Sequence, residues 1–393
     1  MTRRVHFACV LLSIWAATGT VFGDGGFFFV EAEGVDLTQT RQEVLMAFYS
    51  DATGATPHVT YVLQTRYAGT PEELAWVIPV PATPTDLVAH ADGELFDELN
   101  ESTKPVFTLA RPTGYGLIPG CACPGALDRA GGAQESGLVE VEAQGQAGIF
   151  DWAALTSTGA NALLDWLNGN GFALPATAAG VLDDYIQQEM HFLALRIDEP
   201  NDVNTSDGEI EIPPIQFTCQ SAQRFYPMVI SQISAADETE VLIYVVAEHR
   251  AEAANVSNAL IDPNDVVYDP NSLSSTNYEA LFTQTISDLG GTALITEFAG
   301  PAQYRIDETI WPDAPAAALD LATLTRLRTV IARERMDLDF EFRDAPTDDY
   351  VGRSFWVDLP RDANAAVVAG QPLAALLLLG LFRKVMSRRA RRS

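Results

Sequence analysis

Three consecutive stretches near the start of the chain have the hydrophobic patterns of β-strands. Residues 43–50 are apolar on both faces, which is typical of a strand covered on both sides. Residues 58–67 alternate, with Val59, Tyr61 and Leu63 on one face, which is typical of a half-exposed strand. The turn residues between the two predict a hairpin, and residues 74–80 form a third strand that ends in prolines.

Helical spacing of apolar residues follows in several segments. The pattern predicts helices over residues 93–103, around 163–167, around 181–186 and over 278–289. Thr177 precedes the third of these helices and is a candidate N-cap.

Strand patterns return in the second half of the chain. We predict strands at residues 190–197, 212–218, 225–230, 241–247, 293–298 and 338–342, whereas 321–331 fits a helix or a strand equally well. The order of strand, strand and short strand at 43–80 recurs at 190–231, which suggests an internal duplication. The fold class is therefore α+β, with predominantly antiparallel sheets and several short helices.

Both ends of the chain have the composition of membrane-targeting segments. Residues 1–23 combine Arg3 and Arg4 with an apolar stretch and a small-residue cleavage region, which predicts a signal peptide. Residues 365–382 are apolar except for Gln371 and would span about 27 Å as a helix, close to a bilayer core. Residues 383–393 are strongly basic, as the positive-inside rule expects for a cytoplasmic tail.

The tail has two readings. It is either a permanent transmembrane anchor or a sorting signal that is removed after export. In both cases residues 24–364 lie outside the cytoplasm, either anchored in the inner membrane and facing the periplasm or on the cell surface after sorting.

Net charge supports this division of the chain. The whole sequence carries 24 basic and 53 acidic residues; without the two basic residues of 1–23 and the six of 383–393, the net charge of 24–382 is −37. A body this acidic repels phosphate backbones, which argues against nucleic-acid binding.

Between the two ends we divide the chain by composition. The predicted parts are a signal peptide (1–23), a β-rich α+β region (24–110), a Gly/Pro-rich loop or insertion (111–150), a helical pair followed by a second β-rich α+β region (151–364), a transmembrane or sorting helix (365–382) and a basic tail (383–393).

Candidate chemical sites are few. The sequence has no nucleophile elbow, P-loop, HExxH motif or dinucleotide fingerprint. Asp202, Asn204, Asp207 and Glu209 place oxygen ligands at close spacing around Gly208, so calcium is the one cofactor that we consider, against the alternative of a solvated hairpin turn.

Three cysteines remain after removal of the signal peptide. A disulfide between Cys123 and Cys219 would close a long loop, whereas oxidation of Cys121 with Cys123 or an unpaired thiol are the alternatives. We expect Asp337, Asp339 and Glu341 to form the solvated side of the last strand.

Several segments together resemble an exported bacterial family that is known only as domain of unknown function 2330. They are Gly25-Gly26-Phe27-Phe28, Leu74-Ala75-Trp76-Val77-Ile78-Pro79-Val80-Pro81, Leu164-Asp165-Trp166-Leu167, Phe192-Leu193-Ala194-Leu195 and Thr325-Arg326-Leu327-Arg328, followed by the acidic strand from Met336. The resemblance favours a strand at 323–330. It implies no catalytic residues, because the family has no established activity.

These observations favour an exported, membrane-tethered or surface-sorted domain with an interaction or envelope-structural role. Its expected partners are the membrane, through the C-terminal helix, and an envelope protein or a surface polymer. The alternatives are a periplasmic hydrolase or processing enzyme that uses acidic residues, and a calcium-dependent adhesive module.

Overall fold

The computed structural model describes most of the chain between residues 27 and 357. The described residues are 27–29, 38–51, 53–68, 74–90, 94–109, 139–172, 174–197, 204–206, 209–233, 235–269 and 272–357. The predicted signal peptide and the predicted apolar and basic tail lie outside them. Among the described residues, no helix is long and apolar enough to cross a membrane.

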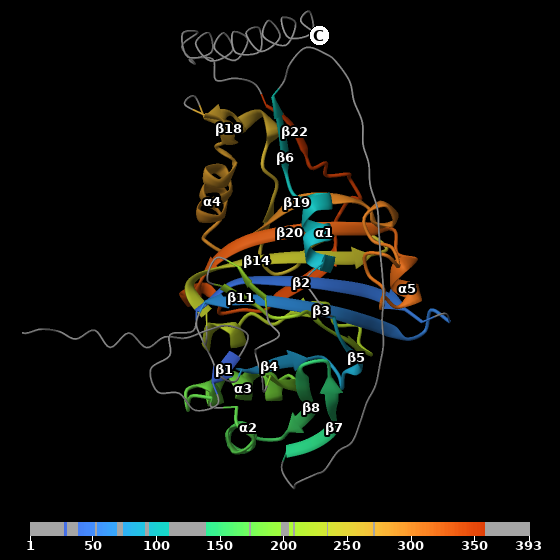
Figure 1. The fold of residues 1–393 in the computed structure, drawn as a ribbon, viewed down its shortest axis with the longest axis vertical. Coiled ribbons are helices and arrows are strands. Elements are labelled where there is room, and N and C mark those ends of the chain that lie inside the picture. Colours follow the sequence, from blue (N-terminus) through green and yellow to red (C-terminus); the bar gives the residue numbers. More distant parts are fainter. Residues whose placement is uncertain are drawn as a thin grey trace, which may run out of the picture.

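A ten-stranded sheet forms the centre of the molecule (Figure 1). Its main path runs β10 (Asn204–Ser206), β11 (Glu209–Glu211), β3 (Pro57–Ala68), β2 (Thr38–Ser50), β14 (Ala235–Ala247), β20 (Thr323–Ala332), β19 (Ala293–Pro301) and β16 (Ser257–Ala259). Strand β12 (Ile215–Cys219) also pairs with β3, and β5 (Thr85–Ala89) pairs with β12. The β2–β14 and β16–β19 pairs are parallel, and the other pairs are antiparallel.

A smaller antiparallel sheet packs against one face of the large sheet. Its order is β1 (Phe27–Phe29), β4 (Leu74–Val80), β9 (His191–Ile197), β8 (Phe150–Ser157) and β7 (Val139–Ala147). Alternate side chains of both sheets, such as Val44, Ile243 and Leu193, meet in the main core. We call this side of the large sheet its inner face. Helices α2 (Ala160–Gly169) and α3 (Ala178–Gln187) cover the far side of the small sheet through Leu167 and Leu182.

The outer face of the large sheet, on the side of Leu45 and Tyr244, is covered by different elements. Helices α1 (Glu94–Thr103), α4 (Tyr278–Asp288) and α5 (Ala316–Leu319) lie on this side (Figure 1). Two small pairs lie beyond them, β6 (Val106–Leu109) with β22 (Ser354–Val357) and β17 (Tyr268–Asp269) with β18 (Ser272–Thr276).

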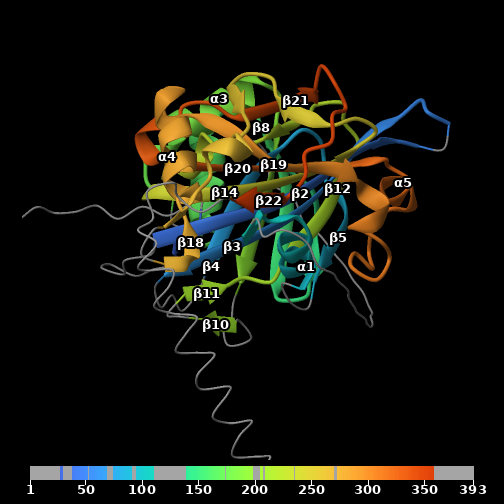
Figure 2. The same cartoon turned by 90° about the horizontal axis from the view of Figure 1, so that it is seen from above.

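The remaining elements are short. A three-stranded sheet contains β13 (Phe225–Tyr226), β21 (Phe340–Asp344) and β15 (Ala251–Ala253), and the 3-10 helices are η2 (Ile230–Ile233), η3 (Pro263–Asp265), η4 (Ala302–Tyr304) and η5 (Arg333–Arg335). Seen from above, the β2–β3 hairpin extends past the rest of the body near α5 (Figure 2).

The predicted α+β class with mostly antiparallel sheets is confirmed. The four helices are present as α1 to α4, and residues 323–332 form a strand rather than a helix. Strands of the two predicted β-rich regions pair with each other in both sheets, since β2 pairs with β14 and β4 pairs with β9.

Some local predictions differ from the structure. Residues 139–147 were assigned to the loop at 111–150 but form β7, because Val139 and Val141 alternate with glutamates against the core. Residues 225–230 form only the two-residue strand β13 before η2. The side chain of Thr177 makes no capping hydrogen bond.

The three-strand unit is not repeated in the structure. Strands β2 and β3 form a hairpin, whereas β9 and β12 lie in different sheets. The segment 190–231 therefore does not reproduce the pairing of 43–80.

Asp339 was predicted to lie on the solvated side of the last strand, but its side chain faces the interior of the protein. Its Oδ1 accepts hydrogen bonds from the Tyr185 hydroxyl at 2.7 Å and from the backbone N–H groups of Met228 and Val229 at 2.7 and 2.9 Å. Burial raises its pKa above the usual range of an aspartate, against the opposing effect of these hydrogen bonds. The carboxylate thereby joins α3, the segment before η2 and the segment before β21.

Replacement of the Asp339 carboxylate should destabilise the folded protein. We expect Asp339→Ala to lower the free energy of unfolding by about 2–3 kcal/mol, because it leaves a buried hydroxyl and two N–H groups without their acceptor. Asp337→Ala, at an exposed position two residues away, should change it by no more than about 0.5 kcal/mol. Urea unfolding of both variants measures the difference, and equal effects would contradict this role of Asp339.

Candidate functional site

Charged side chains form a continuous row across the outer face of the large sheet. Residues at alternate positions of a strand share one face, and the strand register places these ionic groups side by side. We call this row the ionic stripe; it consists of Glu211 (β11), Arg66 (β3), Arg41 and Glu43 (β2), Glu240 (β14), Arg326 and Arg328 (β20), Glu297 (β19) and Glu279 (α4).

The most buried part of the ionic stripe is the pair of Arg326 and Glu297. The Arg326 Nε donates to Glu297 Oε2 at 2.7 Å, and both side chains are almost completely shielded from solvent. The Nη1 of Arg326 also donates to Asn100 Oδ1 at 2.8 Å, Thr103 Oγ1 at 3.2 Å and the Tyr244 hydroxyl at 3.0 Å. This arginine therefore fixes the C-terminal turn of α1 on the sheet.

Arg328 continues the row two residues further along β20. Its Nε donates to Glu240 at 2.6 Å, and its two terminal nitrogens donate to the two oxygens of Glu279 at 3.0 Å each. The guanidinium also lies 4.3 Å from the ring centre of Phe282. Burial opposes the charge of Arg328, but the surrounding carboxylates raise its pKa above the usual arginine value.

Glu43 lies on β2 between Arg41 and Arg66, and its side chain is only 3% exposed. Its Oε1 accepts from Arg41 Nη2 at 3.0 Å, while its Oε2 lies 3.8 Å from Arg66 Nη2 and accepts no hydrogen bond from the described residues. Burial raises the pKa of Glu43 above the usual range, and this effect outweighs the opposing charges of Arg41 and Arg66.

The remaining arginines of the ionic stripe, Arg41 and Arg66, also form ion pairs. Arg66 Nη2 lies 2.9 Å from Glu211, which also accepts from Gln64 Nε2 at 2.7 Å. Arg41 reaches Glu240 at 3.6 Å and so connects β2 with β14. The arginines of the ionic stripe are thus paired with carboxylates of neighbouring strands and of α4.

Three histidine–carboxylate pairs of the described residues lie outside the ionic stripe, and the most widely spaced joins His90 Nδ1 to Asp313 Oδ2 at 3.9 Å. His191 Nδ1 lies 2.7 Å from Glu142 Oε2 and 3.4 Å from Thr83 Oγ1. Since both partners meet the same ring nitrogen, this group lacks the relay of a nucleophile triad, in which base and nucleophile use opposite nitrogens. His249 Nδ1 lies 2.8 Å from Asp348, whose hydrogen bond raises the pKa of His249.

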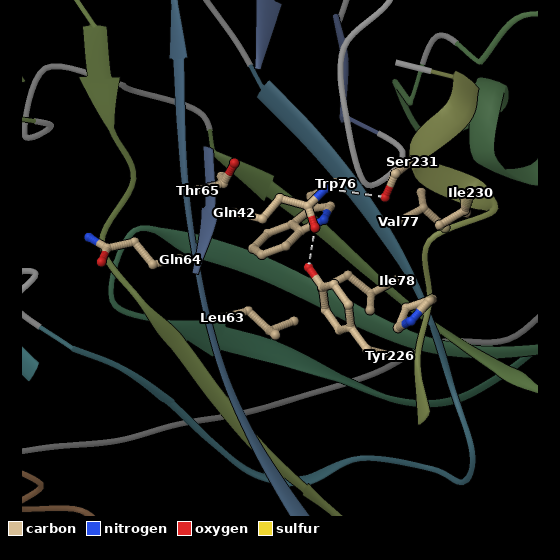
Figure 3. Close-up of a pocket in the computed structure, with 11 residues that line it drawn as sticks. Gln42, Leu63, Gln64, Thr65, Trp76, Val77, Ile78, Tyr226, Ile230 and Ser231 are labelled. Atoms are coloured by element: carbon tan, nitrogen blue, oxygen red, sulfur yellow. Dashed lines mark hydrogen bonds between the residues drawn. The ribbon is translucent and has the colours of Figure 1, made fainter. Parts of the chain in front are cut away.

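A small pocket lies between the two sheets (Figure 3). The Tyr226 hydroxyl donates to Gln42 Oε1 at 2.6 Å, and Gln42 Nε2 donates to Ser231 Oγ at 3.4 Å. Trp76 and Ile78 form the apolar wall beside them. The volume of about 10 Å³ corresponds to a single water molecule.

The structure describes only part of the predicted calcium loop. Strands β10 and β11 form a hairpin in which Asn204 pairs with Glu211 and Ser206 pairs with Glu209, whereas Asp202 and Asp207 lie outside the described residues. No group of three or more His, Cys, Asp or Glu side chains that could hold a metal is found within the described part of the chain. Calcium binding by this loop stays a prediction.

Only one of the two cysteines of the predicted disulfide, Cys219, is among the described residues. Among the described residues Cys219 is buried and bonded to no other cysteine; its Sγ donates to the carbonyl oxygen of Ala82 at 3.3 Å, and burial raises the pKa of its thiol to about 12. Cys123 lies outside the described residues, so the pairing stays a prediction.

The ionic stripe was missed by the sequence analysis. Its signal is a pair of charged residues two positions apart within a strand, near the start of β2 in Arg41-x-Glu43 and in the middle of β20 in Arg326-x-Arg328. Such pairs are read as the solvated face of a strand when each strand is considered alone. Only the register of neighbouring strands shows that they face each other.

The displaced proton affinity of Glu43 gives a pH prediction. Well below pH 4.5, the usual pKa of a glutamate, Glu43 is protonated in both the folded and the unfolded chain. As the pH rises through the higher pKa of the folded state, the unfolded chain has already released this proton, so ionisation of Glu43 lowers the free energy of unfolding. Glu43→Gln does not titrate and should lack this loss.

Urea unfolding between pH 4 and pH 7 measures the effect. The free energy of unfolding of the wild type minus that of Glu43→Gln should fall as the pH rises, while circular dichroism checks that the variant is folded. A difference that stays constant or increases with pH would contradict the raised pKa.

Comparison with known proteins gives a family but no function. A comparison with curated proteins finds no match. A family described as an uncharacterized protein conserved in bacteria, DUF2330, matches residues 32–348. This range contains every described strand of the large sheet, all strands of the small sheet except β1, and the whole ionic stripe. The chain therefore belongs to the bacterial family DUF2330.

Proposed function

We propose that this protein is an exported binding domain that residues 365–382 hold at a membrane. The sequence supports this with the signal-like residues 1–23, the apolar segment 365–382 and the basic residues 383–393 after it. The observation that carries the proposal is the position of β22, the last described strand, only a few residues before the apolar segment.

Strand β22 is a firm part of the body rather than a loose extension. It pairs in parallel with β6, and Phe355 packs against Phe107 and Tyr278 at ring-centre distances of 5.4 and 5.7 Å. The seven residues 358–364 can span at most about 25 Å. The proposed membrane segment would therefore hold the β6–β22 end of the body close to the bilayer.

The net charge of the body favours a partner that carries positive charge. Residues 24–382 carry a net charge of −37, because 16 of the 24 basic residues and all 53 acidic residues of the chain fall within them. Such a body attracts cationic partners and repels polyanions. A basic envelope protein or a basic surface polymer is the partner class that this charge supports.

Removal of the tail tests the tether. We expect the full chain to remain in the membrane fraction after carbonate extraction, whereas a chain that ends at Asn364 should be released as a soluble protein. Attachment of an unrelated transmembrane helix after Asn364 should restore the membrane association.

Membrane association of the chain that ends at Asn364 would contradict the tether. In the same cells, a protease added to spheroplasts should digest the body of the full chain. A body that is digested only after lysis would contradict its export.

A further inference from the structure

Trp356 is an unusually exposed tryptophan close to the end of the body. Its neighbours Phe355 and Val357 are buried, whereas 69% of Trp356 is exposed, because alternate residues of β22 face opposite sides. A single exposed apolar side chain needs no explanation, so the neighbours of Trp356 decide whether it belongs to a larger apolar surface.

Other exposed apolar side chains lie near this strand. Strand β22 packs against η3, and the residues on either side of η3 include Leu260 and Val267, which are 52% and 37% exposed. Three of the six large hydrophobic side chains that are exposed among the described residues thus belong to β22 and the segment around η3. We call Leu260, Val267 and Trp356 the apolar rim.

The apolar rim rests on a rigid base. Phe355, Phe107, Tyr278 and Phe282 form a separate apolar cluster with α4 beneath β22. Tyr278 is further fixed by the hydrogen bond from its hydroxyl to Glu297 Oε1 at 2.9 Å. The ionic stripe therefore connects this end of the body firmly to the large sheet.

The chain outside the described residues indicates what meets the apolar rim. The apolar segment begins at Ala365, eight residues after Val357, so the linker cannot carry Trp356 further than about 30 Å from its start. Tryptophan favours the headgroup layer of a bilayer, where its ring meets apolar surface and its N–H meets water. The acidic body has no electrostatic attraction for an anionic bilayer, so only the tether and the apolar contact would hold it there.

We propose that the apolar rim rests in the headgroup layer of the membrane that holds residues 365–382. The body then docks on the bilayer in one orientation, with the β6–β22 end against the lipid and α2 and α3 at the far end (Figure 1). This inference rests on the proposed tether and adds a second contact with the membrane.

Tryptophan quenching by brominated lipid tests the contact. Residues 358–393 contain no tryptophan, so quenching by phosphatidylcholine brominated near the headgroup end of its acyl chains reports on the body. The full chain without residues 1–23, in vesicles of this lipid, should lose part of its emission relative to vesicles of unbrominated phosphatidylcholine. Trp356→Phe should abolish most of that loss.

Two control variants locate the contact. Trp166→Phe, on α2 at the far end, should leave the quenching unchanged. Tyr304 is 72% exposed but lies on η4, at the end of β19, so Tyr304→Trp combined with Trp356→Phe should not restore the quenching. Because Trp356 and Tyr304 are both exposed, none of these exchanges at their positions should change the melting temperature.

Vesicle flotation separates the two proposals. If the chain floats with the vesicles but the wild type and Trp356→Phe are quenched equally, the contact is wrong and the tether stands. If the chain does not float, both the tether and the membrane contact that rests on it are wrong.

Discussion

The burial of Glu297 between Arg326 and Arg328 is the interaction on which the rest of the structure depends. A carboxylate without solvent is costly unless it is paired and hydrogen-bonded, and here it receives Arg326, Arg328 and the Tyr278 hydroxyl. These partners come from β20 and α4, and Arg326 adds α1 through Asn100. All of these elements must be in place together, so the pair specifies the strand register and the position of both helices.

The remaining ionic stripe extends the same constraint across the sheet. Glu240 joins β14 to β20 through Arg328, and Arg41 and Glu43 bring β2 into the row. These arginines and carboxylates pair across neighbouring strands and so tie the strands together, although Glu43 Oε2 and the Nε atoms of Arg41 and Arg66 have no hydrogen-bond partner among the described residues. The proposed membrane contact lies away from this row, at the end of the body opposite α2 and α3.

Sequence patterns predict the parts of this fold that depend on local order. The strand at 43–50, the alternating strand after it and the helix at 278–288 were all recognisable from apolar spacing. Strand β7 was not, because only Val139 and Val141 alternate with its glutamates, and the rest of the strand consists of alanines, glutamines and a glycine. The role of Asp339 was also hidden, because its hydroxyl and N–H donors lie more than 100 residues away. The same is true of Arg326 and Asn100, which are 226 positions apart.

A double-mutant cycle between Arg326 and Glu297 tests this account most directly. Arg326→Met and Glu297→Gln should each lower the free energy of unfolding by about 3–5 kcal/mol, since each leaves a buried polar partner unmatched. The double variant should lose little more than one single variant, which corresponds to a coupling energy of several kcal/mol. Additive losses, with a coupling energy near zero, would contradict the claim that this buried pair holds the sheet and its helices together.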